Sequence, residues 1–199
     1  MSDSFLRSLV LASGNAGKLE EFSGLLEPLG YVLKPQAHWN VPEAPEDAPT
    51  FLENALIKAR NASLHTGLAS LADDSGLVVP ALGGEPGIFS ARYAGADGGD
   101  KANNRKLLSA MEGLEGAARS AYFHCVTVLM RSADDPVPLV ACASWHGEIA
   151  LSESGSGGFG YDPLFWLPEL ACTSAQLSRE EKSRLSHRGQ SVRKLMSLV

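Results

Sequence analysis

A short segment near the start of the chain, Ser13–Lys18 (SGNAGK), has the residue types that hold an anion. It follows an apolar run at 9–12 and precedes a helical pattern, so we expect a strand, a turn and a helix. The first N–H groups of a helix, and the positive end of its dipole, point out of its N-terminus. The two glycines allow unusual dihedrals and close backbone approach, and Lys18 adds a positive charge. The segment predicts a phosphate-binding turn; the alternative is an ordinary turn with a surface lysine.

Two adjacent carboxylates, Asp73 and Asp74, follow a second apolar run at 68–72. Neighbouring residues of an extended chain point to opposite sides, so one carboxylate can face a site while the other serves the turn. A carboxylate near Mg²⁺ can bind the metal or take a proton from an attacking water. The acidic, proline-rich loop 35–49 offers Glu43, Glu46 and Asp47 as further oxygen ligands. The alternatives are a plain turn and a solvated loop.

A glycine-rich loop at 155–163 carries Phe159 among its glycines. An aromatic ring beside bare backbone suits a planar base, since base–aromatic stacking contributes about 1–3 kcal/mol. Further along, Lys182, His187 and Arg188 supply donors for a base carbonyl or a phosphate. The alternatives are a flexible loop with its aromatics in the core and a basic helix end that complements the helix dipole.

The elements that position these residues follow from hydrophobic spacing and capping signals. Thr50 and Glu53 form a capping box ahead of an apolar series, which predicts a helix ending near Gly67. On that helix Asn54 and Lys58 lie four residues apart and share a face, from which the lysine can reach a phosphate; an exposed lysine is the alternative.

The remaining pattern mixes β-α units with an antiparallel pair, which predicts an α/β fold with a mixed sheet. The expected strands are 8–13, 31–34, 68–72 and a hairpin of 120–131 with 137–150, and the expected helices are 16–28, 100–111, a short helix capped by Ser178–Glu181, and 190–199.

Composition restricts the partners and the setting. The 199 residues fit a single domain, 1–199, and the net charge of -6 gives no general attraction to nucleic acid or to an anionic membrane. Residues 1–7 lack the basic and apolar regions of a signal peptide, and no apolar run approaches the length of a membrane span. Cys125, Cys142 and Cys172 lack metal-ligand spacing, so we expect buried free thiols in a reducing cytoplasm.

Six segments, taken in chain order, resemble the motifs of the inosine/xanthosine triphosphate pyrophosphatase family. The resemblance runs from about Leu9 to the C-terminus, and Ser13 in place of threonine keeps the hydroxyl. The segments are Ser13–Lys18 (SGNAGK), Thr50–Ala55 (TFLENA), Ala72–Leu77 (ADDSGL), Pro86–Arg92 (PGIFSAR), Gly157–Pro163 (GGFGYDP) and Ser186–Arg188 (SHR).

This resemblance implies a Mg²⁺-dependent hydrolase that converts ITP, dITP and XTP to the monophosphate and pyrophosphate, and so cleanses the nucleotide pool. It implies an elongated mixed sheet flanked by helices, with two lobes around a central nucleotide cleft, in a homodimer. Asp74 would be the general base and, with Glu46, a metal ligand. The implied substrate contacts are Ser13, Gly14, Asn15, Ala16, Gly17 and Lys18 for the triphosphate, Ser75 and Lys182, and Phe159, Gly160, Tyr161, Asp162, His187 and Arg188 around the base.

Donors such as His187 and Arg188 favour the O6 acceptor of hypoxanthine and xanthine over adenine, although guanine shares that oxygen. Three other functions stay open at this stage. They are a related pyrophosphatase for modified pyrimidine triphosphates, a nucleotide sensor without catalysis and a purely structural module. The Phe159 loop and the 186–188 segment favour the purine branch, and intact Asp74 and Glu46 disfavour the sensor.

Overall fold

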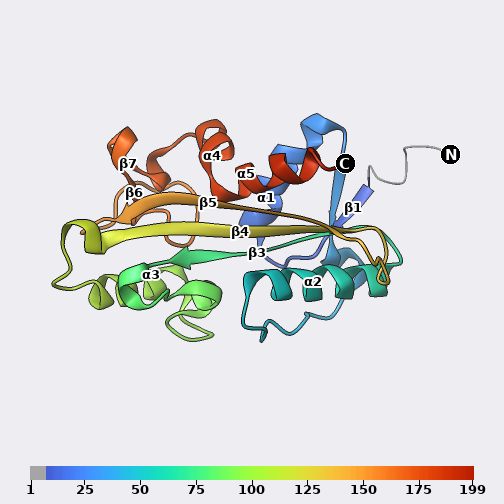
Figure 1. Ribbon diagram of the computed structural model, residues 1–199, viewed down its shortest axis with the longest axis horizontal. Helices are drawn as coiled ribbons and strands as arrows, with labels where there is room; N and C mark the ends of the chain where they lie inside the picture. Colours follow the sequence, from blue (N-terminus) through green and yellow to red (C-terminus); the bar gives the residue numbers. More distant parts are fainter. Residues whose placement is uncertain (1–7) are drawn as a thin grey trace. The chain divides into compact units, whose positions relative to one another are not determined.

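The computed structural model describes residues 8–199, which form a seven-stranded sheet in the order β2-β1-β3-β4-β5-β6-β7 (Figure 1). Residues 1–7, on which the expectation of no signal peptide rests, lie outside the described part. The strands are β1 Ser8–Leu11, β2 Val32–Pro35, β3 Ser70–Val78, β4 Ser120–Met130, β5 Leu139–Ile149, β6 Phe165–Leu167 and β7 Cys172–Thr173. The helices are α1 Ala16–Leu26, α2 Phe51–Thr66, α3 Gly99–Ala110, α4 Arg179–Leu185 and α5 His187–Met196.

The strand directions make the sheet mixed, as predicted. β1 runs parallel to β2 and to β3, whereas β5, β6 and β7 pair antiparallel. Short 3-10 helices complete the chain: η1 Glu27–Leu29, η2 Gln36–Trp39, η3 Pro80–Leu82, η4 Gly87–Arg92, η5 Gly116–Arg119, η6 Pro168–Leu170 and η7 Ser174–Gln176. An α/β fold with a mixed sheet is therefore confirmed.

The chain divides into two compact units. Unit 1 contains the chain up to Asp74, together with Cys125–Ala143 and His187–Val199. Unit 2 contains Ser75–His124 and Ser144–Ser186. Strands β3, β4 and β5 each contribute residues to both units. A single domain with two lobes stays a prediction.

The core of unit 1 shows why its elements form. Residues of β1, and Ala12 directly after it, alternate between the two faces of the sheet. Leu9 and Leu11 pack with α1 and α5, whereas Val10 and Ala12 pack with α2 (Figure 1). Small side chains on α2 let that helix approach the strands closely. The buried helix residues are Phe22 and Leu26 of α1, Val192 and Leu195 of α5, and Ala55, Ala59 and Ala62 of α2.

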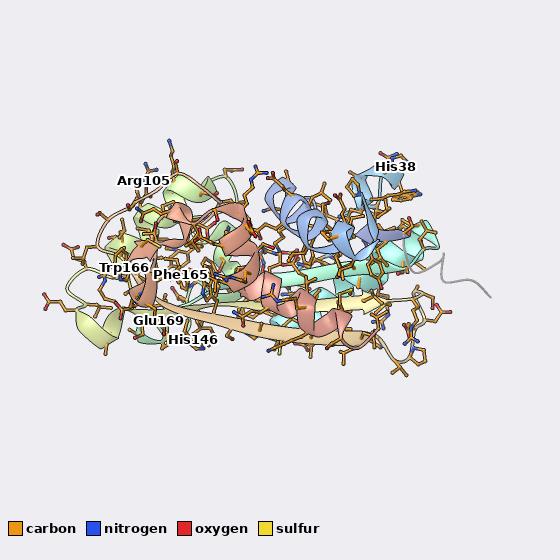
Figure 2. The ribbon with its side chains drawn as sticks, turned by 90° about the horizontal axis from the view of Figure 1, so that it is seen from above. His38, Arg105, His146, Phe165, Trp166 and Glu169 are labelled. Carbon is orange, nitrogen blue, oxygen red and sulfur yellow. The ribbon has the colours of Figure 1, made fainter. Side chains whose placement is uncertain are left out.

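Unit 2 has a separate core that is rich in aromatic residues. Phe165 of β6, labelled in Figure 2, is fully buried. The centre of its ring lies 4.7 Å from that of Phe123 and 5.1 Å from that of Trp145. Leu107 and Met111, at the end of α3, pack into the same cluster. Such tilted aromatic contacts add to the stabilisation by burial.

Several boundaries differ from the sequence prediction. β3 does not end before the paired aspartates but runs through them to Val78, and α5 begins at His187 rather than at 190. The short strands β6 and β7 were not predicted. The hairpin is confirmed as β4 and β5, adjacent strands joined by a connection too short to run back for a parallel pairing.

The three cysteines are free thiols, as predicted, but only Cys125 is buried. Cys142 is exposed and Cys172 is half-buried, so the expectation of burial is wrong for these two. Among the described helices, none combines the length and apolarity that crossing a membrane requires.

Candidate active site

The predicted phosphate turn lies between β1 and α1 in unit 1. Asn15 caps the helix: its Oδ1 accepts a hydrogen bond from the Lys18 N–H at 3.1 Å. The Ser13 hydroxyl accepts one from the Asn15 N–H, also at 3.1 Å. Gly14, Asn15 and Ala16 are exposed, so the backbone at the start of the helix can be reached by a ligand.

The first of the two reasons expected for the glycines of this turn, unusual dihedrals, is wrong, whereas room for close approach of a ligand to the backbone stays a prediction. Gly17 lies inside α1 and Gly14 does not have a positive φ, so neither adopts a conformation reserved for glycine. Gly14 instead faces the acidic loop, where a Cβ would lie 3.6 Å from a carboxylate oxygen of Glu43.

Asp73 is fully buried and forms ion pairs with two cationic side chains, Lys18 and Arg188. Its Oδ2 lies 3.0 Å from the Lys18 ammonium and 3.4 Å from a guanidinium nitrogen of Arg188. Arg188 also forms an ion pair with Glu21 of α1. Burial opposes ionisation of Asp73, but the charges of Lys18 and Arg188 outweigh it and hold the pKa of this carboxyl well below its usual range.

Asp74 contacts a different set of residues, on α2. Its Oδ1 accepts a hydrogen bond from the Lys58 ammonium at 2.7 Å, and the same ammonium lies 3.0 Å from Oε1 of Glu46. Asn54 exchanges two hydrogen bonds with the backbone of Ala48 and so ties the acidic loop to α2. Its amide also lies 3.5 Å from Oδ2 of Asp74.

The charges around Asp74 shift both partners of the pair. Burial raises the pKa of Asp74, and the attraction of Lys58 offsets this only in part. For Lys58, burial acts to lower the pKa, but the carboxylates of Asp74, Asp73 and Glu46 together raise it.

The strand explains how adjacent aspartates serve different partners. Because β3 is extended through these residues, their side chains alternate, and Asp73 meets α1 and α5 whereas Asp74 meets α2. The sequence argument from alternation is confirmed, but the alternative of a plain turn is wrong. The alternative of an exposed Lys58 is wrong as well, because the residue is buried.

The glycine loop in unit 2 is closely packed. Asp162 accepts hydrogen bonds from the Phe159 N–H at 2.8 Å, from the Lys182 ammonium at 2.6 Å and from the Ser174 hydroxyl at 2.7 Å. Gly158, with φ 72°, lies so close to Asp162 that a Cβ there would overlap the carboxylate. The loop therefore requires this glycine for close approach to Asp162.

Phe159 lies half-buried in this loop, and the Lys182 ammonium lies 5.0 Å from the centre of its ring. Tyr161 is buried in the core of unit 2, where its hydroxyl donates to the Ser90 carbonyl at 2.8 Å. Burial raises the pKa of that hydroxyl. Within the loop, the Phe159 side chain is thus partly accessible to a ligand, whereas the Tyr161 side chain is buried in the core.

The predicted site residues are divided between the two units. The Ser13–Lys18 turn, Glu46, Asp74, His187 and Arg188 belong to unit 1, whereas Ser75, Phe159–Asp162 and Lys182 belong to unit 2. Sequence reasoning missed Glu21, the partner of Arg188, since no spacing links residues so far apart. It also missed Asp100 and Asn104 of α3, which bond the backbone of Gly160.

Comparison with known proteins identifies the family. The family model described as Ham1 matches residues 9–198. The chain belongs to the Ham1 family. A dITP/XTP pyrophosphatase of Thioalkalivibrio sulfidiphilus is 55% identical over 94% of this chain and 96% of its own length. One of Nitrosomonas europaea is 53% identical over 98% and 95%, respectively.

Solved structures of Ham1 proteins support the same assignment. The structure of a HAM1 protein from Coxiella burnetii is 46% identical to this chain, covers 96% of it and 97% of its own chain, and has a TM-score of 0.88. The Ham1 protein of Staphylococcus aureus gives 38% identity, the same coverage and a TM-score of 0.84. The resemblance inferred from the motifs is therefore confirmed at the level of the family.

Proposed function

We propose that this Ham1 protein is a nucleoside triphosphate pyrophosphatase that hydrolyses ITP, dITP and XTP to the monophosphate and pyrophosphate. The names of its relatives support this substrate class rather than modified pyrimidine triphosphates. The observation that carries the proposal is the arrangement around Asp74, whose carboxylate lies 2.7 Å from the Lys58 ammonium, which in turn lies 3.0 Å from Glu46.

In the proposed reaction the protein acts by positioning the reactants and by transferring a proton. A water molecule cleaves the bond between the α- and β-phosphates, and Asp74 takes its proton as general base. Lys58 holds that carboxylate in place through its short hydrogen bond. Positioned general bases contribute about 10²–10⁴-fold to such reactions.

The turn between β1 and α1 holds the triphosphate in this proposal. The exposed N–H groups at the start of α1 and the Ser13 hydroxyl donate to phosphate oxygens. Lys18 adds a positive charge, and the Asp73 carboxylate, 3.0 Å from the Lys18 ammonium, holds that charge in position. Asn15 keeps its amide Nδ2 for the substrate, since its Oδ1 caps the helix.

The residues around Asp74 fit a magnesium ion. Glu46 and Asp74 already share one cation, the Lys58 ammonium, and their carboxylates are the hard oxygen ligands that Mg²⁺ prefers. Among residues 8–199 no cluster of three or more His, Cys, Asp or Glu stands ready to hold a metal. Two carboxylates completed by phosphate oxygens are the usual arrangement for Mg²⁺. The bound metal would neutralise phosphate charge.

The glycine loop recognises the base in this proposal. Phe159 stacks on the purine, and Asp162 and Lys182 hold the backbone and ring of Phe159 in place. Ser75 contacts the substrate beside Asp74, and Gly160 and Tyr161 contribute backbone. His187 and Arg188 lie at the start of α5. In this proposal a His187 donor favours a 6-oxo purine, whereas the buried Arg188 guanidinium holds Asp73 and Glu21.

The experiment is a product assay on the purified protein with Mg²⁺ and ITP, dITP, XTP, GTP, ATP or dTTP. Pyrophosphate and orthophosphate are measured separately. We expect pyrophosphate from ITP, dITP and XTP and little product from the others. Orthophosphate as the product would place the attack at the terminal phosphate and overturn the proposal. Thermal stabilisation by nucleotide without turnover would make the protein a sensor.

We also propose that the enzyme works in the cytoplasm as a homodimer. The free thiols support a reducing compartment. The dimer rests on the family resemblance alone. Sedimentation equilibrium tests it directly, because a mass near 21.1 kDa would show a monomer.

A further inference from the structure

Helix α3 holds the backbone of the base loop at Gly160. Asp100 and Asn104 lie one helical turn apart and share a face of α3. Asp100 Oδ2 accepts a hydrogen bond from the Gly160 N–H at 2.7 Å, and the Asn104 amide donates to the Gly160 carbonyl at 3.2 Å. One helix face thus binds both polar groups of a single residue.

Gly160 is a position where such support matters. Its φ of 62° is left-handed, and it has no side chain to anchor it in the core. The residues on either side are fixed differently: the Phe159 N–H bonds Asp162, and the Tyr161 hydroxyl bonds Ser90. The contacts from α3 therefore complete the restraint of the backbone that carries the Phe159 ring.

Asn104 is poorly suited to a purely structural position. The residue is 3% exposed, and its Oδ1 is buried without a hydrogen-bond partner in the described structure. The orientation of the amide is set by Gly160, because a carbonyl oxygen only accepts and so requires the NH₂ group. A leucine would fill a similar volume without burying an unpaired acceptor. The bond to Gly160 is what this amide provides.

We infer that Asp100 and Asn104 are positioning residues that hold the Gly160 peptide and thereby set the orientation of Phe159 for stacking on the purine. This inference rests on the proposed function, in which Phe159 contacts the base. Loss of the α3 contacts lets the loop sample other conformations and weakens only the base-dependent part of binding. The hold on the triphosphate is unaffected.

The kinetic test uses Asp100→Ala and Asn104→Leu, with Asp100→Asn as the conservative variant and Asp97→Ala as the control at an exposed aspartate before α3. We expect KM for ITP to rise about 10-fold in the first two, with kcat within about twofold. Asp100→Asn keeps an acceptor for the Gly160 N–H and should stay near wild type, as should Asp97→Ala. A merely structural role would lower kcat and stability instead.

Two further measurements distinguish an effect on binding of the base from an effect on binding of the phosphates. The inhibition constant of inorganic tripolyphosphate, which has no base, should not change in Asp100→Ala. In Phe159→Ala the KM rises, and adding Asp100→Ala should raise it no further, because both changes remove one interaction. Independent effects in the double variant, or weaker tripolyphosphate binding in the single variant, would overturn the inference.

Hydrogen exchange distinguishes failure of this inference from failure of the proposed function. Without nucleotide, the Gly160 amide of Asp100→Ala should exchange at least about 10-fold faster than in wild type. Unchanged exchange rejects the restraint by α3 whatever the substrate is. A wild-type enzyme inactive on ITP rejects the proposed function, and with it the role in base binding. An active wild type whose KM is insensitive to Asp100→Ala rejects the inference alone.

Discussion

At the scale of single residues, two neighbouring carboxylates have different partners because a strand turns them to opposite faces. Asp73 lies against Lys18 at 3.0 Å and is fully buried, whereas Asp74 lies against Lys58 at 2.7 Å. Asp73 is committed to holding cations in place. Asp74 borders the acidic loop through the Lys58–Glu46 contact, and it is the carboxylate that we propose acts on the substrate.

Replacement of Asp74 by Asn tests this division. The amide is close in shape but cannot take a proton from water, so we expect kcat to fall by about 100-fold or more while nucleotide still binds. Turnover is measured as pyrophosphate release and binding by calorimetry. Asp47→Asn, at an exposed position of the acidic loop 35–49, is the control and should keep wild-type kcat. Near wild-type turnover in Asp74→Asn would remove Asp74 from the catalytic role.

Replacement of Lys18 by Ala tests the phosphate turn. The change removes a charge from the start of α1, so we expect KM for ITP to rise about 10-fold or more with a smaller effect on kcat. Lys34→Ala, at an exposed position of β2, removes the same charge elsewhere in unit 1. A similar KM in the two variants would show that Lys18 contributes only to the general charge of the protein.

The sequence predicted the residues with local signals and not those held by distant contacts. Lys18 follows a glycine-containing turn and Asp74 follows an apolar run, and both carry charge, so the sequence alone marks them as candidates. The ion pair of Glu21 with Arg188, 167 positions apart, leaves no trace in spacing. The sequence did not predict the hydrogen bonds of Asp100 and Asn104 to Gly160, because an aspartate and an asparagine in a helical sequence are typical of a solvent-exposed face.

At the scale of elements, the hairpin of β4 and β5 has a defined turn. Asp135 accepts hydrogen bonds from the backbone N–H groups of Arg131 and Val137 and from the Arg131 guanidinium, each at 3.0 Å. The hydrogen bond from the Arg131 backbone is the main reason that its pKa is below the ordinary value. The residue closes the turn between two strands that run through both units.

Replacement of Asp135 by Ala should lower the free energy of unfolding by about 1–2 kcal/mol at pH 7, since three hydrogen bonds are lost. A carboxyl group whose pKa is lower in the folded state than in the unfolded state stabilises the fold at any pH above the unfolded-state pKa. This stabilisation is lost as the pH falls through the folded-state pKa. The difference from wild type should therefore shrink below about pH 4. Urea unfolding at several pH values measures it, and Asp134→Ala, an exposed neighbour, should show no such loss.

Elements were predictable where pattern and caps agreed. The helix after Thr50 begins where predicted, because the Thr50 hydroxyl accepts the Glu53 N–H. The second half of the capping box differs from the prediction, since the Glu53 carboxylate accepts from the Thr50 hydroxyl at 2.5 Å. The predicted strand ends before Asp73, because Asp, Ser and Gly are typical of turns. In the structure β3 continues through this segment, whose aspartates are buried and form ion pairs with Lys18 and Lys58. The strands β6 and β7 are too short, at three and two residues, to show any periodicity.

At the scale of the whole molecule, the chain passes repeatedly between its two compact units. It does so within β3, β4 and β5 and again between Ser186 and His187. Because each of these strands belongs to both units, we expect the loss of its hydrogen bonds in one unit to disturb the other. We therefore expect the two cores to unfold in one cooperative transition.

Tryptophan fluorescence tests this cooperativity. Trp39 is in unit 1, whereas Trp145 and Trp166 are in unit 2, and the chain has 3 tryptophans. In Trp39→Phe, fluorescence therefore reports unit 2 alone, while far-UV circular dichroism reports helices of both units. The two signals should give the same urea midpoint and the same slope. Separate midpoints would show that each core folds independently, and the prediction of a single domain would then fail, because shared strands would not suffice to couple the cores.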